Sequence, residues 1–81
     1  MRIRVLRRHI NKGRRYKYLS CPVALAIREA TGKKVKVKES SLERGKNSVV
    51  SPHEVTDFVC QFDLGEPVSP FTFTLDNKLI K

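Results

Sequence analysis

Few side chains in this sequence have the type and spacing that catalysis or metal binding needs. The candidate zinc ligands are two cysteines and two histidines: His9, Cys21, His53 and Cys60. None of them forms the closely spaced Cys pair or His pair that is typical of a structural zinc site, so we expect no metal. The chain also lacks a Gly-rich phosphate loop, a GxSxG elbow and a cluster of paired carboxylates. The sequence therefore predicts a protein without enzymatic activity and without a cofactor.

Cys21 is the one side chain whose surroundings could make it reactive. It is expected at a helix N-terminus among basic residues, and both conditions lower the pKa of a thiol. A buried thiol that only packs in the core is the alternative that the sequence favours. Cys60 is expected to pack at the flank of a later helix. We expect both thiols to be reduced, because two distant cysteines do not make a disulfide framework.

Charge is the strongest compositional feature. The 81-residue chain has 17 Lys and Arg against 8 Asp and Glu, a formal net charge of +9. Residues 1–28 hold nine of the basic residues and no acid, whereas residues 47–76 hold five acids and no Lys or Arg. Such an asymmetric field steers and orients an anionic partner. Nucleic acid, DNA or RNA, is the partner we expect. An acidic protein surface and plain solubility are the alternatives that charge alone leaves open.

The expected contacts are basic side chains on two strands and one loop, with an aromatic ring among them. The predicted set is Arg2, Arg4, Lys12, Arg14, Arg15, Tyr16, Lys17, Lys34, Lys36 and Lys38. Lys and Arg neutralise phosphates and release counterions, and a tyrosine between basic residues can stack on an exposed base. Each feature has a structural alternative. The lysines could solvate an open sheet face, and Tyr16 with Tyr18 could cover the edge of the core.

Hydrophobic periodicity predicts the elements that position these residues. The expected strands begin almost at Met1 and run toward Ile10, then cover residues 34–38, 48–50 and 71–75. The expected helices run from Ser20 to Gly32 and from Pro52 to about Gly65. Ser51, Pro52 and Glu54 have the pattern of a capping box, and residues 40–47 that of a hairpin loop.

The resulting βαββαβ order predicts an α+β domain of the ferredoxin-like, split-βαβ type. Two helices would cover one face of a single four-stranded antiparallel sheet. We expect one domain over residues 1–81, with residues 77–81 as a tail that could fray. The open sheet face would then be a basic, hydroxyl-bearing plate that combines the arginines, the lysines, Thr72 and Thr74. Because RNA-recognition motifs of this topology need aromatic residues on the central strands, we do not expect that mode of RNA binding.

Three segments carry a resemblance to known sequences. They are HIxxG at His9–Gly13, CPVALA at Cys21–Ala26 and FDxGxPVxPFxF at Phe62–Phe73. With them the chain resembles a group of small phage and prophage proteins. The resemblance implies a protein of a mobile element, expressed in the bacterial cytoplasm, where small proteins often act on host or defence machinery. It implies no particular activity.

These observations give two functional hypotheses. The first is a non-enzymatic protein that binds nucleic acid mainly through phosphate contacts. The alternative is a phage-encoded inhibitor or adaptor that docks its basic surface on a bacterial host or defence complex. Dimerisation by edge-strand pairing is a further possibility. No apolar run approaches the ~20 residues that cross a bilayer, so we expect a cytoplasmic protein without a membrane partner.

Overall fold

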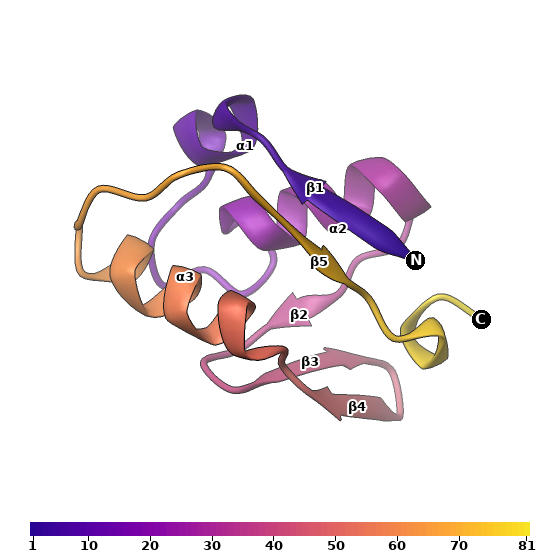
Figure 1. Cartoon of the computed structure of the whole chain (residues 1–81). Helices are drawn as coiled ribbons and strands as arrows, with labels where there is room; N and C mark the ends of the chain where they lie inside the picture. Colours follow the sequence, from indigo (N-terminus) through magenta and orange to yellow (C-terminus); the bar gives the residue numbers. More distant parts are fainter.

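The first strand of the chain pairs with the last. The structure is a computed structural model that describes all 81 residues. In it, β1 (Arg2–Val5) and β5 (Phe71–Thr74) form a two-stranded antiparallel sheet (Figure 1). The register sets Ile3 opposite Phe73, and both side chains are buried. The strict alternation of apolar and polar residues in β1 therefore turns its apolar side chains to the core, as its period of two predicts.

A second, separate sheet contains three short strands in the order β2-β3-β4. These strands are β2 (Lys36–Val37), β3 (Ser41–Arg44) and β4 (Asn47–Val50), and both pairings are antiparallel. Val37 and Leu42 face each other across β2 and β3 and are buried. Gly45 has a φ of 59° in the turn between β3 and β4, a conformation that glycine adopts without a steric penalty.

Three helices and one short 3-10 turn complete the fold. They are α1 (Arg7–Lys12), α2 (Pro22–Thr31), α3 (His53–Asp63) and η1 (Asn77–Leu79). Helix α2 begins with Pro22 in its first turn and ends at Gly32, whose φ of 73° makes a left-handed cap. Both ends agree with the sequence prediction. None of the helices has both the length and the apolar composition needed to span a membrane.

One core joins the two sheets to the helices. It contains 16 buried hydrophobic residues from β1, α2, the β2-β3-β4 sheet, α3, β5 and η1. The largest fully buried side chains among them are Ile3, Ile27, Leu42, Leu75 and Leu79. Because both sheets, α2 and α3 contribute to this cluster, the basic surfaces described below rest on the same packed interior.

The predicted four-stranded sheet of a ferredoxin-like fold is wrong, and the edge of β2 shows why. The N–H of Val37 donates to the carbonyl of Tyr18 at 2.9 Å, so the loop before α2 occupies this position at the free edge of β2. The other edge of β2 pairs with β3, which lies inside the segment predicted as a loop. Strand β3 therefore takes the place beside β2 that was expected for residues 48–50, and β1 pairs only with β5.

The first strand is also shorter than the sequence predicts. Leu6, His9 and Ile10 have the spacing i, i+3 and i+4, and the chain uses it as one face of α1. His9 is buried and Ile10 is half-buried on that face. The alternation of β1 thus stops at Val5, because the next apolar residues follow a helical period.

The start of α3 and the C-terminal end of the chain also differ from the prediction. Helix α3 has Pro52 at its N-cap, without a side-chain cap, and the buried Oγ of Ser51 has no hydrogen-bond partner. The predicted capping box is therefore wrong. The C-terminal residues do not hang free: Leu79 is buried, and Arg44 Nη1 donates to the carbonyls of Leu79 at 3.2 Å and Lys81 at 3.3 Å.

Candidate nucleic-acid interface

Most basic side chains of this protein have no carboxylate partner. Among the 17 Lys and Arg, only Arg8 and Lys38 form ion pairs, with Glu29 and Glu43. Two more arginines donate to backbone carbonyls. The others make no side-chain hydrogen bond within the chain: Arg2, Arg4, Lys12, Arg14, Arg15, Lys17, Arg28, Lys33, Lys34, Lys36, Lys46, Lys78 and Lys81. Their charge is therefore free to meet an anionic partner.

The outer face of the β1-β5 sheet is one basic surface, which we call the strand face. Arg2 lies opposite Thr74 and Arg4 opposite Thr72, and both arginines are exposed. The apolar residues between them point inward, and β1 contacts α2. The predicted grouping of these two arginines with the two threonines is thus present in the structure. Guanidinium and hydroxyl groups in adjacent positions can donate to neighbouring phosphate oxygens.

The predicted lysine strand does not join this face. Lys36 lies on β2 in the other sheet, and Lys34 precedes it. Both line an open hollow of about 270 Å³ together with Leu19 and Arg44. The single basic plate predicted from the sequence is therefore wrong, because its two halves belong to different sheets.

Lys38 is occupied by contacts within the chain. Its Nζ lies 3.1 Å from Glu43 Oε1 and 5.9 Å from the centre of the Tyr18 ring. The hydrogen bond from Lys38 is the main cause that lowers the pKa of the Glu43 carboxyl below its usual value. Of the three predicted lysines, Lys38 is thus the one whose charge is already balanced.

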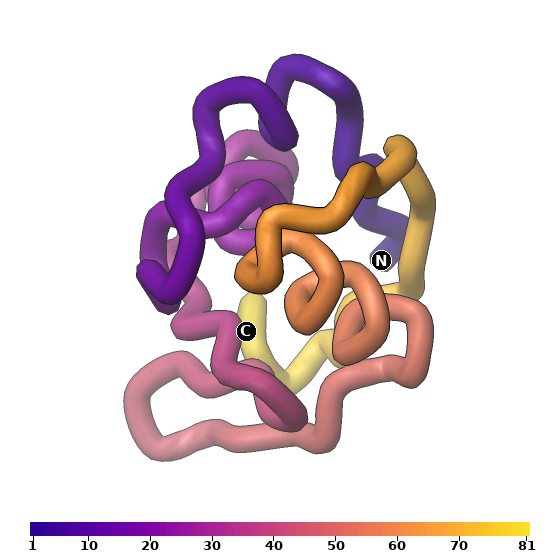
Figure 2. Tube along the Cα trace, turned by 90° about the vertical axis from the view of Figure 1, so that its left-hand side faces the viewer, coloured from indigo at the N-terminus to yellow at the C-terminus, as the bar shows by residue number.

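The loop of residues 13–20 holds the other predicted contacts and is fixed to the end of α3. The N–H of Arg14 donates to the Ser20 carbonyl at 2.9 Å and closes the loop. The N–H of Tyr16 donates to Asp63 Oδ1 at 2.9 Å. The guanidinium of Arg15 lies against Gly65, where a Cβ would come within 3.1 Å of Nη2. Figure 2 shows this loop beside the C-terminal end of α3.

Tyr16 adopts a backbone conformation that side chains rarely tolerate. Its φ is 59°, and it is the only non-glycine residue of the chain with a positive φ. The left-handed conformation costs an L-residue about 1–2 kcal/mol. The ring is nevertheless 66% exposed, so it does not cover the edge of the core. A strained residue with an exposed ring is more typical of a binding site than of a packing position.

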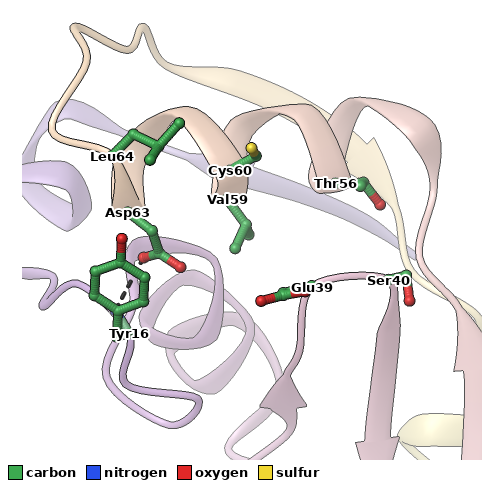
Figure 3. Close-up of a pocket in the computed structure, with 8 residues that line it drawn as sticks. All are labelled: Tyr16, Glu39, Ser40, Thr56, Val59, Cys60, Asp63 and Leu64. Atoms are coloured by element: carbon green, nitrogen blue, oxygen red, sulfur yellow. Dashed lines mark hydrogen bonds between the residues drawn. The ribbon is translucent and has the colours of Figure 1, made fainter.

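Tyr16 stands at the end of a groove on the surface of the structure. This groove has a volume of about 450 Å³ and lies between the 13–20 loop, the β2-β3 connection and α3. Its lining residues are Tyr16, Glu39, Ser40, Thr56, Val59, Cys60, Asp63 and Leu64 (Figure 3). The two carboxylates could not be placed here from the sequence, because no pattern puts residues 39 and 63 near Tyr16. Only the folding of α3 against the loop brings them together.

A second basic surface, the hairpin end, was also missed. Lys46, Asn47, Ser48, Lys78 and Lys81 line an open hollow of about 400 Å³. Asn47 Nδ2 donates to the carbonyl of Lys78 at 3.1 Å and holds η1 against the start of β4. The two C-terminal lysines belonged to a segment expected to fray. Leu79, which is buried, and Ile80, which is half-buried, form an apolar pair inside that polar tail, and this pair is the signal that could have placed the lysines.

His9 and Glu29 resemble a catalytic pair, but both ring nitrogens are already used. His9 Nδ1 accepts the N–H of Leu6 at 2.9 Å, so the ring proton lies on Nε2 and is donated to Glu29 Oε2 at 2.8 Å. Hydrogen bonds from Arg8 and then from His9 lower the pKa of the Glu29 carboxyl. The cluster therefore ties α1 to α2, and no nitrogen is left to exchange a proton with a substrate.

Cys21 has the buried position that the sequence favours, whereas Cys60 does not pack as expected. Burial raises the pKa of the Cys21 thiol to about 11, which outweighs its position at the N-terminus of α2. The alternative of an inert, buried Cys21 is therefore correct. Cys60 is exposed and lines the groove, so its predicted packing role is wrong. No group of three His, Cys, Asp or Glu side chains is placed to hold a metal ion.

Comparisons with protein-family models, with curated proteins and with solved structures give no significant match. The resemblance to phage proteins therefore stays a prediction. Any function has to be inferred from the surfaces of this chain.

Proposed function

We propose that this protein is a non-enzymatic binder of nucleic acid that acts mainly through phosphate contacts. The observation that carries this proposal is the number of unpaired cations: 17 Lys and Arg make only two ion pairs with carboxylates. Unpaired, exposed Lys and Arg are the groups that neutralise phosphates and release counterions. Solubility alone does not require hydroxyl groups aligned with arginines, as they are on the strand face.

The distribution of these cations favours an extended polyanion over a small anion. The 13–20 loop lies toward the left of Figure 1, whereas both termini and the turn of the hairpin lie toward the right. The molecule measures 32 Å along its longest axis. A B-form duplex advances about 3.4 Å per phosphate on each strand, so this length corresponds to roughly nine base pairs. A nucleic acid of that length can reach more than one basic surface at once.

The test compares an unpaired arginine with a paired lysine. Binding of a labelled DNA duplex is followed by fluorescence anisotropy over a series of salt concentrations that begins at about 50 mM, where phosphate contacts are strongest. We expect Arg4→Gln to weaken binding and to reduce the slope of log K against log salt by about 0.9. Lys38→Gln is the control, with the same loss of formal charge from a side chain that already pairs with Glu43. Equal effects of the two substitutions would show that net charge, and not the strand face, determines binding.

A second candidate is docking on an acidic surface of a host or defence protein. The hollow beside β2 favours it, because there the half-exposed Leu19 lies among Lys34, Lys36 and Arg44. Apolar and basic side chains in one place are typical of a protein interface. A pull-down from nuclease-treated lysate separates the two candidates. One stoichiometric protein that survives nuclease supports docking, and loss of all partners supports nucleic-acid binding.

A further inference from the structure

The groove at Tyr16 combines features that a simple phosphate-binding surface does not need. Its volume of about 450 Å³ is within the range of small-molecule sites. Val59 and Leu64 make part of its wall apolar. In Figure 3, Tyr16 and Asp63 stand at one end, and the carboxylate of Glu39 points toward them from the β2-β3 connection. An aromatic ring, an apolar wall and a carboxylate are the groups that hold an unstacked base.

The fold keeps Tyr16 at this position despite its backbone strain. The hydrogen bond from its N–H to Asp63 Oδ1 fixes the strained residue to α3, and the ring stays exposed at the mouth of the groove. Strain of this kind is concentrated at ligand-binding positions, where the surrounding structure enforces it. One carboxylate oxygen of Asp63 is thus used to position Tyr16. Glu39 makes no hydrogen bond or ion pair within the chain and is free to accept one from a ligand.

The charges around the groove select the type of ligand. Two carboxylates line it, and three unpaired cations, Arg14, Arg15 and Lys17, lie on the loop that carries Tyr16. Lys17 also lines the adjoining hollow of about 90 Å³, with Tyr18. A purely cationic ligand would meet the loop, and a purely anionic one would meet the carboxylates. A nucleotide unit satisfies both, because its phosphate is anionic and its base carries N–H donors.

Guanine is the base whose donors fit a single free carboxylate. Its N1–H and N2–H groups are adjacent and parallel, so both can donate to the two oxygens of one carboxylate. Thymine and uracil present one N–H on that edge, and adenine presents only its amino group. We propose that the groove takes one unstacked guanine of a single-stranded nucleic acid, stacked on Tyr16 and hydrogen-bonded to Glu39. This proposal rests on the nucleic-acid function proposed above and adds a base preference to it.

The test uses oligothymidylates that differ at one central position. That position is guanine, inosine or thymine; inosine lacks the N2 amino group but keeps N1–H. Affinities are measured by fluorescence anisotropy at one fixed salt concentration. We expect the guanine probe to bind about tenfold more tightly than the thymine probe, with inosine between them, since a good bidentate contact discriminates by about that factor or more.

Two substitutions connect the preference to the groove. Glu39→Gln changes an exposed side chain and should remove the preference for guanine over inosine, because an amide presents one acceptor and one donor group. Tyr16→Ala should weaken binding of the guanine probe by about tenfold, as loss of a stacking platform does. Glu54→Gln on the exposed start of α3, outside the groove, is the matched control and should leave the preference unchanged.

The outcomes separate this inference from the function on which it rests. Equal binding of the three probes, unaffected by Glu39→Gln, would overturn the guanine site and leave phosphate binding intact. Binding of none of these probes and of no DNA duplex at about 50 mM salt would overturn the nucleic-acid function itself. A guanine preference that persists in Glu39→Gln would place the base elsewhere and would also overturn the site.

Discussion

The conformation of Tyr16 gives a prediction in which the usual order of two substitutions is reversed. At an ordinary loop position, alanine makes a protein more stable than glycine by about 0.4–1 kcal/mol, because glycine has more freedom in the unfolded chain. At a φ of 59°, a residue with a Cβ pays about 1–2 kcal/mol that glycine does not pay. The second effect is larger, so Tyr16→Gly should be more stable than Tyr16→Ala by about 1 kcal/mol.

The comparison isolates the backbone because both variants lose the same ring. Tyr16 is 66% exposed, and the bond from its N–H to Asp63 Oδ1 is available to either variant. The free energy of unfolding is measured by urea titration. A difference of about 1 kcal/mol also corresponds to roughly 4–8 °C in Tm for a domain of this size. Lys17 is the control, since it lies next in the loop without a positive φ, and there alanine should be the more stable variant.

If Tyr16→Ala is as stable as Tyr16→Gly or more stable, the left-handed conformation is not present in solution. Tyr16 would then have no strained position to hold its ring at the groove, and the proposed guanine site would rest on Glu39 and the apolar wall alone.

Three more predictions concern Ser51, the two cysteines and Glu29. Ser51→Ala should leave the stability unchanged or raise it slightly, because it removes a buried hydroxyl without a partner; a loss of about 1 kcal/mol by urea titration would instead show that Ser51 caps α3. In the folded protein, iodoacetamide at pH 8 should label the exposed Cys60 and not Cys21, because burial raises the Cys21 pKa to about 11. In urea it should label both, and mass spectrometry counts the labels. Rapid labelling of both cysteines in the native protein would contradict this. Glu29→Gln should reduce the free energy of unfolding at neutral pH, because the pKa of Glu29 is lowered in the folded state. The stabilisation by Glu29 is therefore present above its ordinary pKa of 4.5 and is lost as the pH falls through the folded-state pKa. Urea titration against pH measures this, and a difference from wild type that persists in acid would exclude the ion cluster.

The parts of the fold that the sequence predicts well are those with strong local signals. Helix α2 has a proline at its start and a glycine at its end, and both act as expected. The alternation in β1 and β5 likewise predicts which side chains face the core. These features depend on the chemistry of neighbouring residues, which can be seen without knowing the rest of the chain.

The pairing of the strands could not be predicted in the same way. It depends on which strands lie side by side in the folded chain: β3, inside a segment predicted as a loop, pairs with β2, and the Tyr18 carbonyl accepts the N–H of Val37 at the other edge of β2. Strand β3 has only one buried residue, Leu42, so it shows no alternation that could reveal it. Long-range competition for sheet edges therefore determines the topology here, and local patterns do not record it.

In the candidate site, too, local patterns place some residues, and only tertiary folding places the others. Arg2 and Arg4 could be assigned to one face because the strand period fixes their direction. Glu39 and Asp63, which give the groove its character, lie 24 positions apart and meet only through tertiary folding. The charge asymmetry of the sequence predicts an anionic partner, whereas the lining residues of the groove are known only from the structure.

The salt dependence of DNA binding tests directly whether this protein binds nucleic acid through phosphate contacts. The affinity for a short DNA duplex is measured by anisotropy over a series of salt concentrations that begins at about 50 mM. If about five phosphates are neutralised, log K should fall against log salt with a slope of about −4 to −5. No binding at the lowest salt, or a slope near zero, would contradict the account of this protein as a phosphate-dependent nucleic-acid binder.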